Sequence, residues 1–156
     1  MEKNILIPSD FSICSLCLVK EVIDKEDGRV NIFLIHGIGK PSGFFKRIFF
    51  SEHQLLKDLL NDSFIDACEI LKNKHASKIN SIQPIVLMDN DEEIFMSKVH
   101  ELQIDEVFLP ENTDYELIRP TSFDLRPLLQ KLNLPQREIA VNIDVTKKGL
   151  EQLFFA

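Results

Sequence analysis

Asn4-Ile5-Leu6-Ile7-Pro8-Ser9-Asp10-Phe11-Ser12, near the N-terminus, is the stretch that decides the fold. Its apolar run, residues 4–7, is typical of a strand buried on both faces, and Pro8 ends the run because proline cannot donate to a sheet ladder. Residues 9–12 then provide turn and N-cap side chains, and apolar residues recur at helical spacing from Ile13 to Ile23. The stretch therefore predicts a strand, a tight turn and a helix.

The rest of the chain repeats this alternation. Apolar runs predict four further strands, and helical periodicity predicts the segments between them. Pro84 suits an edge strand or a strand start, and Pro110 is expected to end the fourth strand. The pattern indicates an α/β fold: an open five-stranded parallel sheet, flavodoxin-like, with helices on both faces. The predicted strands are 4–7, 29–36, 82–88, 104–109 and 138–143, and the later helices are 51–74, 91–102 and 121–132.

Length and composition set bounds on the function. A chain of 156 residues is long enough for one hydrophobic core and too short for two, so we expect a single domain over residues 1–144. The tail, residues 145–156, is expected to add one or two helical turns. The net charge of −7 argues against a nucleic-acid partner. No apolar run has the length of a membrane span, and the N-terminus lacks a secretory pattern, so we expect a cytoplasmic protein. The three cysteines are then expected to be reduced thiols.

The opening stretch resembles that of the universal stress protein family, whose first strand typically runs into Pro-Thr/Ser-Asp-Phe-Ser. Asp91-Glu92-Glu93-Ile94, which leads to Ile104-Asp105-Glu106-Val107, is similar to the third helix and fourth strand of that family. The resemblance covers nearly the whole chain. It implies an adenine-nucleotide alpha-hydrolase-like sheet with strand order 3-2-1-4-5.

The glycine-rich ATP-binding motif of the family is missing. In nucleotide-binding members the Asp of the opening motif contacts the adenine-ribose part of ATP, and glycines after the fourth strand wrap the phosphates, since only glycine leaves room for their approach. This chain has no glycine between Gly43 and Gly149, and Glu111 and Asp114 would repel a triphosphate. We therefore expect a divergent member without a cofactor or enzymatic activity. The alternative is a nucleotide-binding stress protein with an altered phosphate site.

Three residues are candidates for a site at the carboxyl ends of the strands: Asp10, Ser12 and His36. Asp10 is interpreted first as a turn and cap residue. His36, at the end of the second strand, is either a hydrogen-bonded structural histidine, which we favour, or a catalytic one. The four histidines and three cysteines show no metal-ligand spacing, so neither a metal site nor a catalytic set is predicted.

Cys14-Ser15-Leu16-Cys17 places a C-x-x-C at the start of the first helix. A lowered thiolate pKa at such a position would support a thiol redox sensor, which is a third hypothesis for the function. We favour the interpretation that Cys14 and Cys17 are small helix residues, and that Cys68 belongs to the core.

The segment Phe44-Phe45-Lys46-Arg47-Ile48-Phe49-Phe50 has four phenylalanines around two basic residues. It could anchor the protein to a membrane surface, but one short segment in an acidic protein is weak for that role. Packing against the second helix or between subunits is favoured.

The fifth predicted strand is expected to form a homodimer. In the order 3-2-1-4-5 it is a sheet edge, and neither lysine nor proline interrupts it. Family members resembling this chain dimerise through that strand, and the tail could add apolar contacts across the junction. We therefore expect a stress-response or regulatory homodimer that acts through contacts with an unidentified protein partner. The interface residues are Glu138, Ile139, Ala140, Val141, Asn142 and Ile143.

Overall fold

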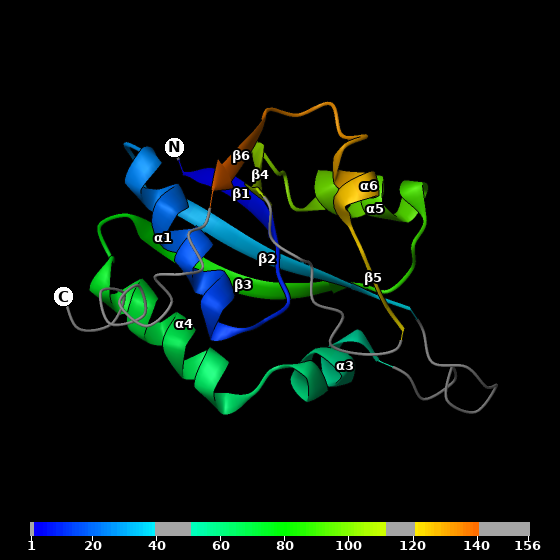
Figure 1. Cartoon of the computed structure of the whole chain (residues 1–156), viewed down its shortest axis with the longest axis horizontal. Coiled ribbons are helices and arrows are strands. Elements are labelled where there is room, and N and C mark those ends of the chain that lie inside the picture. Colours follow the sequence, from blue (N-terminus) through cyan, green and yellow to red (C-terminus); the bar gives the residue numbers. More distant parts are fainter. Residues whose placement is uncertain (1, 40–50, 112–120, 141–156) are drawn as a thin grey trace.

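The computed structural model describes residues 2–39, 51–111 and 121–140, and these residues contain one six-stranded sheet. Five strands are parallel and follow the order β3-β2-β1-β4-β6 (Figure 1). The predicted fold class is confirmed, and the predicted fifth strand corresponds to β6. The five strands are β1 (Lys3–Pro8), β2 (Val30–Ile38), β3 (Ile79–Leu87), β4 (Glu106–Glu111) and β6 (Gln136–Ala140).

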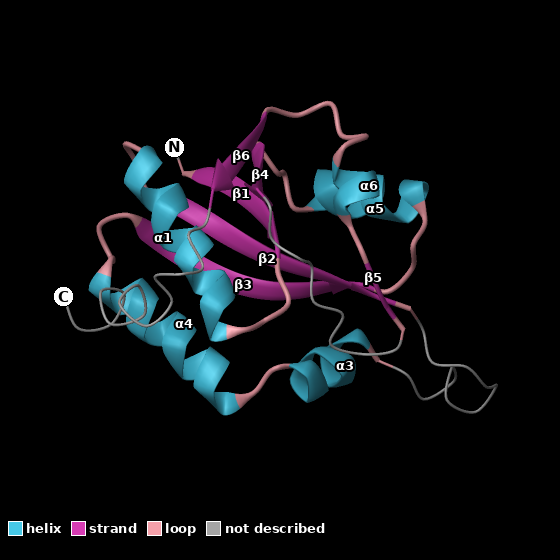
Figure 2. Ribbon diagram, viewed as in Figure 1, coloured by secondary structure: helices cyan, strands magenta, loops and turns pink. Residues whose placement is uncertain are grey.

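β1 is the central strand, and its side chains alternate between two hydrophobic cores. Ile5 and Ile7 join the core beneath α1 and α4, whereas Leu6 joins the core beneath α5 and α6 (Figure 2). All three side chains are fully buried, which agrees with the continuous apolar run in the sequence. The helices are the 3₁₀ helix η1 (Ile13–Ser15), α1 (Leu16–Lys25), α3 (Glu52–Leu59), α4 (Asp62–Lys74), α5 (Glu92–Glu101) and α6 (Arg126–Leu129). None of the helices in the described ranges is long and apolar enough to cross a membrane.

The single helix predicted over 51–74 is wrong, because the structure divides it into α3 and α4. Leu60 has extended dihedrals (φ −83°, ψ 128°), and the Asn61 side chain accepts a hydrogen bond of 2.7 Å from the Phe64 amide. An asparagine in this position is a strong N-cap. The apolar spacing continues across the break, so periodicity alone did not reveal it.

Two predictions around β4 are also wrong. β4 continues through Pro110 to Glu111, and Pro110 is tolerated because β1 pairs with β4 only at Glu106 and Val107. The Val107 amide donates to the Pro135 carbonyl on the β6 side, so alternation turns the nitrogen of Pro110 toward the side that β1 has left. The helix predicted over 121–132 shrinks to α6. The two residues of β5 (Ser122–Phe123) precede it as an antiparallel partner of β2.

Pro84 lies within β3, at one edge of the sheet, as one of the two predicted alternatives required. β6 forms the opposite edge, and its described part contains no proline.

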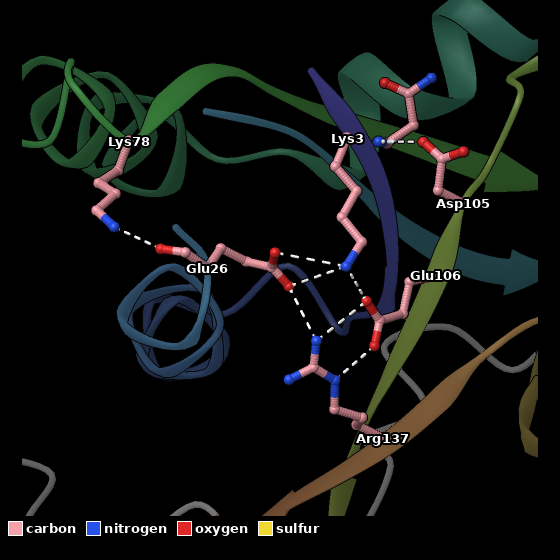
Figure 3. Close-up of polar contacts among 7 residues, drawn as sticks. Lys3, Glu26, Lys78, Asp105, Glu106 and Arg137 are labelled. Atoms are coloured by element: carbon pink, nitrogen blue, oxygen red, sulfur yellow. Dashed lines mark hydrogen bonds and ion pairs between the residues drawn. The ribbon is translucent and has the colours of Figure 1, made fainter. Parts of the chain in front are cut away.

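A cluster of charges joins the amino ends of β1 and β4 to β6 (Figure 3). The Glu106 side chain is only 4% exposed and accepts a 2.5 Å hydrogen bond from Arg137 Nε, while Lys3 pairs with its other oxygen. Glu26 accepts from Lys3 at 3.2 Å and from Arg137 at 3.2 Å. Burial alone would raise the pKa of Glu106, but the hydrogen bonds from Arg137 and Lys3 outweigh it and lower the pKa below its ordinary value.

Because the pKa of Glu106 is lowered in the folded state, its ion pairs stabilise the fold above the pKa of an unfolded glutamate and lose this effect as the pH falls through the folded value. We expect Glu106→Gln to lower the free energy of unfolding by about 1–3 kcal/mol at pH 7. Urea unfolding at pH 7 and at about pH 3 measures both values, and the difference between variant and wild type should shrink at the lower pH. Glu101→Gln, at an exposed position, is the control. An equal loss in both variants would contradict the role given to Glu106.

Candidate functional site

Asp10 and Ser12 lie in the turn that follows β1, and they bond to each other. Asp10 Oδ1 accepts hydrogen bonds from the Ser12 amide at 3.0 Å and the Ser12 hydroxyl at 2.6 Å. Ser12 Oγ in turn accepts from the Ser15 amide at 3.2 Å and caps η1. Both side chains therefore have turn and cap roles. Ligand contact by either residue stays a prediction.

Phe11, in the same turn, has a positive φ of 58°, which a residue with a side chain rarely adopts. Its amide donates to Ser9 Oγ at 3.0 Å, and its ring is buried against the rings of His36 and Phe64, with centroids 5.6 and 5.7 Å away. Burial of the ring thus offsets the cost of the left-handed backbone.

His36 is fully buried near the end of β2 and is hydrogen-bonded at both ring nitrogens. Nδ1 lies 2.9 Å from the Ser9 carbonyl oxygen, and Nε2 lies 2.8 Å from Ser122 Oγ. A carbonyl oxygen only accepts, so Nδ1 carries the hydrogen. Burial lowers the pKa of His36, and the Ser9 carbonyl and Asp10 oppose this only in part, so the ring is neutral at pH 7. Nε2 must then accept a hydrogen bond from the Ser122 hydroxyl.

β5 brings Ser122 to this place. Ser122 and Phe123 lie opposite Ile38 and Gly37 of β2, and the Gly39 amide donates to the Thr121 carbonyl at 2.8 Å. β3 already pairs with the other side of β2 as far as Gly37, so β5 lies on the β1 side. β1 itself ends opposite Ile35. β5 therefore occupies the position directly beyond the carboxyl end of β1 (Figure 1).

Ser122 is the residue of this cluster that sequence reasoning missed, since it fell at the start of the helix predicted over residues 121–132. A two-residue strand is too short to show alternation, and its partner lies 86 positions earlier in the chain. No local pattern could have identified it.

The cysteines offer little support for redox chemistry. Cys14 is exposed, Cys17 is partly buried and Cys68 is buried in the core, as predicted for Cys68. Burial, followed by the charges of Cys14 and Glu21, raises the pKa of Cys17, and burial raises the pKa of Cys68 to about 12. A redox-active cysteine needs the opposite shift. Within the described ranges, no three His, Cys, Asp or Glu residues are grouped to hold a metal ion.

Several predicted features lie outside the described residues. They are the segment Phe44–Phe50, the acidic residue Asp114, the interface residues Val141, Asn142 and Ile143, and the tail 145–156.

Comparison with known proteins gives a fold and no more. Neither protein-family models nor curated protein sequences match the chain. Among solved structures, hypothetical protein PH0823 is 19% identical, with 90% of this chain and 97% of that chain covered at a TM-score of 0.52. Hypothetical protein MJ0577, whose structure was used to assign its biochemical function, is also 19% identical, with coverage of 91% and 98% and a TM-score of 0.52.

Members of the universal stress protein family are among the further matches. One, from Arabidopsis thaliana with AMP bound, is 12% identical, with coverage of 91% and 94% and a TM-score of 0.49. The likeness to PH0823 and MJ0577 extends over nine-tenths of this chain and shows a shared fold. At 19% identity it does not show a shared function.

The packing of β5 on β2 can be tested at Gly37. A Cβ built there would lie 2.7 Å from the Phe123 ring, whereas one built at Gly28 would meet nothing within 4 Å. We expect Gly37→Ala to lower the free energy of unfolding by about 1–3 kcal/mol through overpacking, and Gly28→Ala to change it little. Chemical unfolding of both variants measures the difference. Equal stabilities would mean that β5 does not pack on β2 as described.

Proposed function

We propose that this protein is a divergent member of the universal stress protein family that does not bind ATP and has no enzymatic activity. It acts as a homodimer in a stress response or its regulation, through contacts with other proteins. The observation that carries the first part is the position of β5 beyond the carboxyl end of β1. In open α/β sheets this is where ligands enter, at the point where the strand order reverses.

The groups around this position also favour the proposal. Asp10 Oδ1 accepts two hydrogen bonds within its own turn, from the amide and the hydroxyl of Ser12. Glu111 ends β4 as an exposed residue, and its carboxylate adds negative charge at the carboxyl edge of the sheet, which disfavours a phosphate there. The sequence from residue 44 to residue 148 contains no glycine with which a backbone could wrap phosphates.

We therefore expect no ATP binding. Calorimetric titration of the protein with ATP and magnesium should show no saturable heat up to millimolar nucleotide. Native mass spectrometry of freshly purified protein should likewise show only masses that the polypeptide accounts for, with no nucleotide mass added. A micromolar dissociation constant, or a retained nucleotide mass, would support the alternative of a nucleotide-binding stress protein with an altered phosphate site.

The homodimer part of the proposal follows from the two sheet edges. At the β3 edge Pro84 breaks the row of amide donors, so pairing with another strand is discouraged. At the β6 edge nothing interrupts the described residues Gln136–Ala140. The Pro135 carbonyl faces β4, where it accepts from the Val107 amide, and alternation then directs the amides of Gln136, Glu138 and Ala140 to the open edge. Ile139 is 4% exposed and belongs to the core, so pairing would use the backbone rather than this side chain.

Glu138→Pro tests the dimer, because it removes an amide from the open edge and leaves the amides that face β4 in place. We expect the wild-type protein to sediment as a dimer at tens of micromolar, and Glu138→Pro to sediment as a monomer. Glu138→Ala, which loses the same charge but keeps the amide, should remain a dimer. A wild-type monomer under these conditions would refute the proposal, and a dimer that survives Glu138→Pro would exclude β6 as its interface.

A further inference from the structure

Ser122 and His36 form a pair that the proposed function does not use. Ser122 Oγ lies 2.8 Å from His36 Nε2, and the Ser9 carbonyl oxygen lies 2.9 Å from Nδ1 on the other side of the ring. A serine hydroxyl, a neutral imidazole that accepts its proton, and an acceptor that orients the imidazole together form the arrangement of an activated nucleophile. Here a backbone carbonyl has the orienting role that a carboxylate has in the serine protease triad.

The tautomer of His36 makes the direction of proton transfer definite. Because the carbonyl oxygen can only accept, the hydrogen is on Nδ1 and the lone pair of Nε2 points to Ser122. Asp10 lies close enough to favour the charged imidazole, and it would stabilise the ring once it has taken a proton.

The surroundings fit a reactive group better than a purely structural contact. Ser122 is 8% exposed and His36 is fully buried, so Ser122 is the member of the pair that lies nearer the surface. The pair lies beyond the carboxyl end of β1, where sheets of this kind place their sites. The neighbouring Phe11 has the sparsely populated left-handed backbone that clusters at functional sites.

We propose that His36 activates Ser122 as a nucleophile, and that Ser122 is a site of covalent modification by acyl groups from small activated esters. Ser122 Oγ forms a bond to the carbonyl carbon of the ester while its proton passes to His36 Nε2. The carbon–oxygen bond to the leaving alcohol then breaks, the alkoxide departs with the electron pair, and it takes the proton from Nε2. The product is an O-acylated Ser122 with His36 again neutral. This proposal does not depend on whether the protein binds nucleotide or dimerises.

A small dialkyl fluorophosphate tests the pair, because it reacts with activated serines in the same way: a phosphorus–oxygen bond forms, the phosphorus–fluorine bond breaks, and fluoride leaves with the electron pair. Intact-mass spectrometry should show one adduct on the wild-type protein, and peptide mapping should place it on Ser122. Ser122→Ala should give no adduct. His36→Gln should react at least about 100-fold more slowly, the usual contribution of a general base.

Two controls keep the result decisive. Ser97→Ala, at an exposed serine of α5, should be labelled at the wild-type rate. The wild-type protein in an unfolding concentration of urea should not be labelled, which tests the pair even where His36→Gln does not fold. The proposal is overturned by no adduct on the native protein at millimolar reagent, by an adduct on another residue, or by labelling that persists unchanged in urea or in folded His36→Gln.

Discussion

The hydrogen bonds of the buried His36 ring determine how the carboxyl end of this sheet is built. An imidazole without solvent contact must have a partner at each nitrogen, because an unsatisfied buried polar group costs about 1–3 kcal/mol. One partner is the Ser9 carbonyl in the turn after β1, and the other is Ser122 of β5. His36 thereby joins three segments that are distant in sequence, and it requires β5 to lie beyond β1. The position of β5 beyond the carboxyl end of β1 thus satisfies one buried side chain.

The two ends of the sheet are held by different physical means. At the carboxyl end the two hydrogen bonds of the neutral His36 ring are buried. A hydrogen bond is electrostatically stronger in such a low-dielectric interior than in water. At the amino end the buried carboxylate of Glu106 is held by Lys3 and Arg137, whose side chains remain 34% and 45% exposed. Those cations therefore keep part of their hydration, which reduces the cost of burying the carboxylate between them. Arg137 also lies 5.0 Å over the Phe108 ring and so fastens the edge strand β6 to its neighbour.

The sequence predicted the parts of this structure that depend on neighbours in the chain. The buried run before Pro8, a cap among residues 9–12 and a place for Pro84 at a sheet edge or a strand start follow from local chemistry, and the family resemblance added the strand order. The break at Leu60 was missed because apolar spacing continues through it, although Asn61 is a recognisable cap. Pro110 was taken to end β4, but whether a proline breaks a strand depends on which side its nitrogen faces. The pairing of Ser122 with His36 was beyond reach, since only the folded chain brings the two together.

The opening motif can occur in a chain that has no glycine between Gly43 and Gly149, because its residues also have structural roles. Pro8, Ser9, Asp10 and Ser12 each have a structural role here: Pro8 ends the central strand, Ser9 holds Phe11 and His36, and Asp10 with Ser12 builds the turn and caps η1. None of these roles requires a ligand. The glycines of a phosphate-wrapping loop have no such structural role, because they serve to let a phosphate approach the backbone. Without a phosphate they only increase the conformational entropy that is lost on folding. A chain of this fold that binds no nucleotide can therefore keep the first motif for its turn while nothing favours the second. Such a motif is evidence for a fold, and the function has to be argued from the groups that occupy the crevice.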